Sequence, residues 1–136
     1  MKTSTKRLLI AAALLLALGV GFFAGKAAER RETVQNRLGQ GRTKLSFAID
    51  KLEGLRDGEY GPEEIQSDIA SDIYGAYYDF LSGENADFSG ALWDLWNAVL
   101  FDIENLPGNE DALIEALTEQ DADRLEEIAA GMRMPG

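Results

Sequence analysis

The sequence predicts an all-α protein, in which a single N-terminal transmembrane helix precedes a small acidic bundle of about four to five helices. Three observations support this. Residues 8–25 are apolar and uncharged, apolar residues recur three and four positions apart in the rest of the chain, and there is no alternating β-branched run. With 136 residues, 46% of them hydrophobic, the chain has material for one small domain and an appendage.

Composition excludes several classes of protein. The chain has no Cys and no His, which rules out disulfide scaffolds, thiolate or imidazole metal sites, and Ser-His-Asp or Cys-His catalysis. The sequence also lacks a phosphate-binding glycine loop and a dinucleotide-binding motif. We therefore expect no enzyme activity, no cofactor, and no catalytic, cofactor-binding or metal-binding residues.

The first expected element is the apolar segment 8–25, which follows a basic tail of residues 1–7. As a helix it is about 27 Å long, close to the roughly 30 Å of a bilayer's hydrocarbon core. We expect a retained signal anchor. A cleaved signal peptide is the alternative, because Gly25-Lys26-Ala27 is an acceptable small-x-small cleavage site.

The charges that flank this segment bear on its orientation. Three Lys or Arg precede it and six follow within about 20 residues, a count that places the C-terminal domain in the cytoplasm by the positive-inside rule. The start of the chain nevertheless resembles a bacterial signal anchor, and we expect an extracytoplasmic domain. A cytoplasmic domain, or one secreted after cleavage, is the alternative.

Small residues line one side of the apolar segment at intervals of four, namely Ala13, Ala17, Gly21 and Gly25. Such positions share a helix face and allow two backbones to approach closely. The stripe predicts packing against another membrane helix, with a homo-oligomer as one possible result. An Ala-rich apolar segment also produces such a stripe by chance.

Residues 26–42 are expected to form a basic connector. Four of its arginines are candidate contacts for lipid headgroups: Arg30, Arg31, Arg37 and Arg42. Gly39 and Gly41 are expected to end the helix, so that a second helix begins near residue 43 and opens an acidic helical domain over residues 43–133.

The helix expected over residues 43–56 carries an apolar face. We expect Leu45, Ile49, Leu52 and Leu55 to face the domain core. A coiled-coil seam through Leu38, Leu45 and Leu52 is the alternative, although sustained coiled coils need more unbroken heptads.

Charge is distributed unevenly along the chain. Residues 1–56 hold 11 Lys or Arg and four acids, whereas residues 57–123 hold 18 acids and no Lys or Arg. A field of that sign repels phosphate backbones, so we expect no nucleic-acid partner, and it favours basic partners and cations.

Pro62 followed by two glutamates predicts a helix over residues 62–81. Its expected core face is Ile65, Ile69, Ile73, Ala76, Tyr77 and Phe80. Asp68, Asp72 and Asp79 fall on one margin of that face, and Tyr74 and Tyr78 fall on the opposite side. These five side chains are candidate contacts for a protein partner. A divalent cation held by the three aspartates is the alternative.

A further helix is expected to start at an Asp87 or Ser89 cap and to end before Pro107. Trp96 lies on its core face. Trp93 lies on the margin of that face and Phe101 lies outside it, so these two are either partner contacts or covered by other helices. Asn109 and Asp121 are expected to cap two short helices that form a hairpin.

These features together predict a membrane-anchored, noncatalytic binding or scaffold protein whose acidic domain contacts a protein partner at the membrane surface. A cation-binding or cation-sensing domain, and a structural homo-oligomer assembled through the small-residue stripe, are the alternatives.

Overall fold

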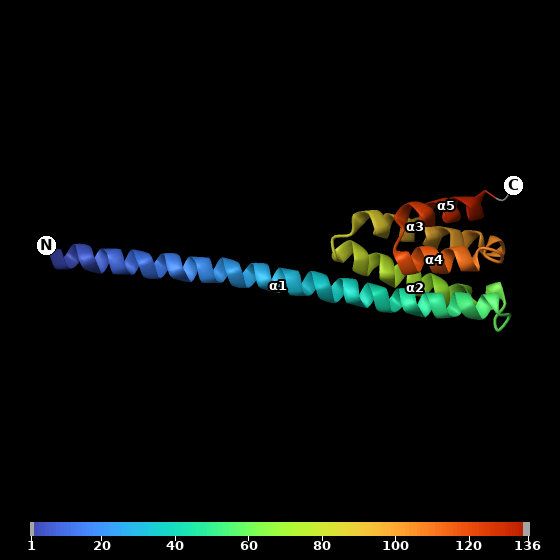
Figure 1. Cartoon of the computed structure of the whole chain (residues 1–136), viewed down its shortest axis with the longest axis horizontal. Coiled ribbons are helices and arrows are strands. Elements are labelled where there is room, and N and C mark those ends of the chain that lie inside the picture. The colour runs from blue at the N-terminus through green and yellow to red at the C-terminus, as the bar shows by residue number, and fades with distance from the viewer. Residues whose placement is uncertain (1, 135–136) are drawn as a thin grey trace. The chain divides into compact units, whose positions relative to one another are not determined.

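A computed structural model describes residues 2–134 of the chain, and these residues form helices joined by short turns (Figure 1). Met1, Pro135, Gly136 and the side chains of residues 2–4 in the basic tail lie outside the described part. The elements are α1 (Lys2–Arg56), α2 (Pro62–Ser82), α3 (Ala86–Phe101), the 3-10 helix η1 (Ile103–Asn105), α4 (Glu110–Glu119) and α5 (Ala122–Arg133). No strand occurs between residues 2 and 134, so the all-α prediction is confirmed.

The chain divides into two compact units. The N-terminal unit is Met1–Val34 and the C-terminal unit is Gln35–Gly136. Helix α1 contributes residues to both units, whereas α2, α3, α4 and α5 belong to the C-terminal unit alone.

The N-terminal unit exposes its apolar side chains. Its large hydrophobic residues from Leu8 to Phe23 are all exposed. The helix is long and apolar enough to cross a membrane, a criterion that a signal sequence also meets.

The predicted helix break at Gly39 and Gly41 is wrong, because α1 continues through both residues to Arg56. The hydroxyl of Thr43 donates a hydrogen bond of 3.0 Å to the carbonyl of Gly39, within the helix. Gly41 is buried against α2, and a Cβ atom added to it would lie 2.8 Å from the ring of Phe80. Gly41 therefore permits close packing of α1 on α2 and does not end the helix.

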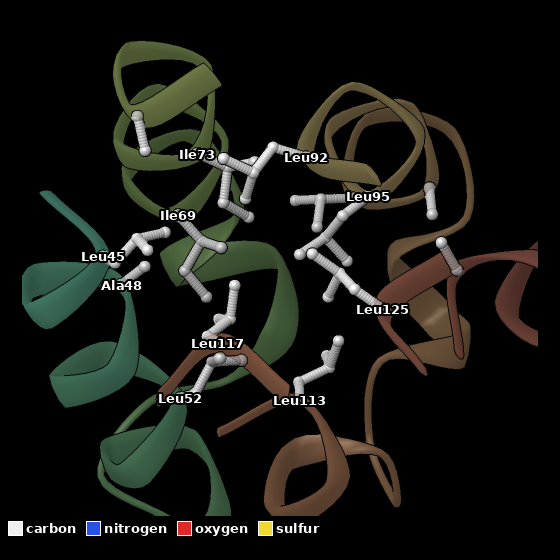
Figure 2. Packing of buried hydrophobic residues seen from close by; sticks show 14 of the residues in the cluster. Leu45, Ala48, Leu52, Ile69, Ile73, Leu92, Leu95, Leu113, Leu117 and Leu125 are labelled. Carbon is white, nitrogen blue, oxygen red and sulfur yellow. The ribbon is translucent and has the colours of Figure 1, made fainter. Parts of the chain in front are cut away.

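Side chains from all five α-helices meet in the core of the C-terminal unit (Figure 2). Leu45, Leu52 and Leu55 of α1 are buried there and Ile49 is partly buried, which confirms that this face of α1 packs on the domain core. The predicted core face of α2 is also buried, except that Tyr77 is only half-buried. The apolar periodicity thus located the core correctly.

Local hydrogen bonds fix where the helices of this unit begin and end. Gly58 has a φ of +80° just after α1, and the amide of Glu59 donates to the carbonyl of Gly54 at 2.8 Å. The expected caps Asp87 and Ser89 are wrong: α3 begins earlier, because the side chain of Asn85 accepts a hydrogen bond from the amide of Phe88.

The two short helices α4 and α5 follow Asn109 and Asp121, as predicted. Asp121 caps α5 by accepting a hydrogen bond from the amide of Arg124, whereas the side chain of Asn109 does not cap α4 and donates to the carbonyl of Asn105 at 2.7 Å. At the end of α3, the side-chain amide of Gln66 donates to the carbonyls of Val99 and Leu100. These two hydrogen bonds connect α2 to the C-terminal end of α3.

The contrast between Gly39 and Gly41 gives a matched test of the α1–α2 packing. An added Cβ at Gly39 meets no atom within 4 Å, whereas at Gly41 it meets the buried ring of Phe80. Both Gly→Ala variants gain helix propensity, but only Gly41→Ala overpacks the core. We expect Gly41→Ala to unfold with about 1–3 kcal/mol less free energy than Gly39→Ala in urea denaturation. Equal stabilities would contradict this packing.

Candidate partner-binding surface

Four aromatic rings of α2 and α3 lie against one another at the surface of the C-terminal unit. Tyr74 contacts Tyr77 and Trp96, and Trp93 contacts the same two rings. The four centroid distances are 5.9, 5.2, 5.2 and 5.0 Å, so the contacts form a closed ring of four side chains. We call Tyr74, Tyr77, Trp93 and Trp96 the aromatic platform.

The platform is only partly covered by the rest of the chain. Tyr74 is 45% exposed and Trp93 is 41% exposed, while Tyr77 and Trp96 are half-buried. Tyr78, one turn beyond Tyr74 on α2, is 54% exposed and extends this apolar surface. An exposed group of large aromatic side chains on a small domain is typical of a protein interface.

The sequence predicts Tyr74, Tyr78 and Trp93 as candidate contacts and places Tyr77 and Trp96 on the core faces of their helices. The structure brings Tyr74 and Trp93 together through those two residues. The spacing of three between Tyr74 and Tyr77, and between Trp93 and Trp96, is a signal in the sequence that aromatic pairs share a helix face.

Phe101 does not join the platform. It lies at the C-terminal end of α3, eight positions after Trp93, and is 68% exposed. Phe101 is largely exposed, whereas Trp93 is partly covered through its contact with Tyr77 of α2 and still exposes 41% of its surface.

Asp79 is not a partner contact, which corrects the sequence-based prediction. Its side chain is 1% exposed and lies between α2 and α1, where Lys44 Nζ is 2.5 Å from its Oδ2 and Arg37 is 3.6 Å from its Oδ1. A buried carboxylate needs such partners, since an unpaired charge is costly to remove from water. Asp79 is therefore a structural residue.

The other two aspartates of the predicted acidic margin have different environments. Asp72 is half-buried and forms an ion pair with Lys51 of α1. Asp68 is exposed and remains a candidate contact. The three carboxylates thus do not converge, and no group of three Asp or Glu placed to hold a metal ion occurs in the described part of the chain. The cation-binding alternative gains no support from this arrangement.

The arginines predicted to contact lipid headgroups fall in both units. Arg30 and Arg31 belong to the N-terminal unit, and Arg37 and Arg42 belong to the C-terminal unit. Arg37 lies 3.6 Å from Asp79 of α2 and its side chain is 43% exposed. Lipid contacts of all four arginines stay predictions.

The small-residue stripe of α1 makes no packing contacts inside its own unit. Ala13, Ala17, Gly21 and Gly25 are exposed, and a Cβ added at either glycine meets no atom within 4 Å. The proposed packing of this stripe against another membrane helix stays a prediction.

No protein-family model, curated protein or solved structure matches the chain.

Asp68 and Asp79 provide a test of the assignment of Asp79 as structural. We expect Asp79→Asn to lower the free energy of unfolding by about 2 kcal/mol, the scale of a hydrogen bond to a charged group, because it removes the charge facing Lys44 and Arg37. Asp68→Asn, at an exposed site, should change it by less than about 0.5 kcal/mol. Thermal unfolding of both variants measures the difference, and equal effects would contradict the assignment.

Proposed function

We propose that the chain is a membrane-anchored, noncatalytic binding protein whose C-terminal unit contacts a protein partner through the aromatic platform. The observation that carries this proposal is the exposure of Tyr74, Tyr78 and Trp93, none of which belongs to the buried core cluster of the domain. Tyr and Trp dominate the binding energy of many interfaces, because they bury a large area with few rotatable bonds.

The apolar part of α1 supports the membrane half of the proposal. Its exposed leucines and phenylalanines would be unfavourable in water, whereas a bilayer covers them and satisfies the hydrophobic effect. The helix itself satisfies its backbone hydrogen bonds, as a membrane-spanning segment requires. We propose that this segment is a retained anchor and that the acidic unit is extracytoplasmic.

The anchor is tested by fractionation. The full chain should remain in the membrane pellet after an alkaline carbonate wash, and a variant lacking residues 1–34 should appear in the soluble fraction, because it loses the exposed apolar segment. Circular dichroism of the truncated variant controls for folding. A mature polypeptide that begins near Ala28 and is recovered entirely in the soluble fraction would contradict the proposal.

The binding surface is tested by photocrosslinking in intact cells. Replacement of Tyr78 by p-benzoyl-phenylalanine places a photoreactive ring beside the platform, and we expect a discrete crosslinked band. The same substitution at Glu127, an exposed residue of α5, is the matched control and should give none. Trp93→Ala in the same chain should reduce the crosslinked yield about tenfold or more, as for an interface hot spot. Crosslinking that is equal at both positions would contradict the proposed surface.

A further inference from the structure

We propose that the aromatic platform binds an arginine-bearing cationic segment of the partner, with guanidinium groups stacked on its rings. This inference rests on the proposed function, because it names the chemistry of the partner that the same surface takes.

The charge of the C-terminal unit favours a cationic partner. Residues 35–136 hold seven Lys or Arg and 22 Asp or Glu, a balance of −15. Five of the seven cations already contact carboxylates within the unit, and they are Arg37, Lys44, Lys51, Arg56 and Arg133. The unit therefore keeps a large surplus of acids that its own cations do not neutralise, and an external cation meets an attractive field.

The same charge disfavours three other occupants of the platform. A second C-terminal unit carries the same balance of −15 and is repelled. Anionic lipid surfaces and nucleic acids are repelled for the same reason. A positively charged protein segment is the macromolecular partner that this electrostatic field attracts.

The geometry of the rings suits guanidinium stacking. Within the four contacts the ring planes are tilted by 39–50°, so no ring is stacked parallel on its neighbour. A cation is attracted to the face of a Trp or Tyr ring when it lies within about 6 Å of the centroid. Arginine is favoured over lysine, because its planar and weakly hydrated guanidinium also stacks on the ring.

Two lysines of the unit are paired with carboxylates away from the platform. Lys44 and Lys51 are held on the α1 side of α2 by Asp79 and Asp72, while Tyr74 lies on the other side of α2 and contacts α3. From residue 57 to residue 123, which includes all of α2 and α3, there is no Lys or Arg. The cations stacked on the platform must therefore come from outside these two helices.

The inference is tested with the full chain in nanodiscs of uncharged phosphatidylcholine lipid. The probe is a synthetic peptide in which arginines alternate with Gly-Ser spacers, and matched peptides carry lysine or neutral citrulline instead. Both tryptophans of the chain, Trp93 and Trp96, lie in the platform, so tryptophan fluorescence reports binding at this site directly. Calorimetry measures affinity for the variants.

We expect a saturable fluorescence change with the arginine peptide, with affinity about fivefold higher than for the lysine peptide. Affinity for the citrulline peptide should be lower again, and binding of the arginine peptide should weaken as salt is raised. Tyr74→Ala should weaken arginine-peptide binding about tenfold. Phe47→Ala, which removes an exposed aromatic ring of α1 outside the platform, is the matched control and should leave it unchanged.

Two results would overturn the inference: equal binding of the arginine and citrulline peptides, or equal affinity of Tyr74→Ala and the unsubstituted chain with normal circular dichroism. Crosslinking at position 78 separates these failures from failure of the proposed function. A crosslinked partner together with no preference for arginine means that the surface binds a partner of different chemistry. Absence of crosslinking means that the surface itself is wrong.

Discussion

The packing of α1 on α2 around the buried carboxylate of Asp79 is the constraint on which the exposed surface depends. Lys44 and Arg37 reach it from α1, and Gly41 lets the backbone of α1 approach the ring of Phe80. Because this margin of α2 faces α1, the opposite side of α2 is directed away from it and meets α3. Tyr74 and Tyr78 are on that side and are exposed there. The ion pairs of Asp79 with Lys44 and Arg37 and the exposure of the aromatic platform thus both depend on the orientation of α2.

The fold was largely predictable from sequence because apolar periodicity is a local signal. The spacing of Ile65, Ile69 and Ile73 located the core face of α2, and the Asp121 cap located the start of α5. The predicted helix end at Gly41 is wrong because it rests on local propensity, by which glycine destabilises a helix. In the structure, Gly41 packs against Phe80, which is distant in sequence, and this contact leaves no room for a side chain. Tertiary packing decided the role of this residue.

The candidate surface was only partly predictable for the same reason. Exposure of Tyr74, Tyr78 and Trp93 follows from their angle around each helix, and the sequence provides that angle. The closure of the four-ring contact depends on which helices become neighbours, and the sequence does not provide that. The role of Asp79 also depends on a neighbour: three aspartates on one margin look equivalent until α1 packs beside them and covers only one completely.

The N-terminal limit of the C-terminal unit has a consequence for limited proteolysis. The folded unit starts at Gln35, so its share of α1 includes Arg37, Gly41 and Lys44, all of which contact α2. The stretch between the apolar segment and this unit contains Lys26, Arg30 and Arg31, which are sites for trypsin-like enzymes. A cut there leaves the C-terminal unit with all three of these contacts to α2, whereas a cut after Arg42 removes Arg37 and Gly41 and keeps Lys44 alone of the three. The two fragments would therefore differ in stability and in resistance to further proteolysis.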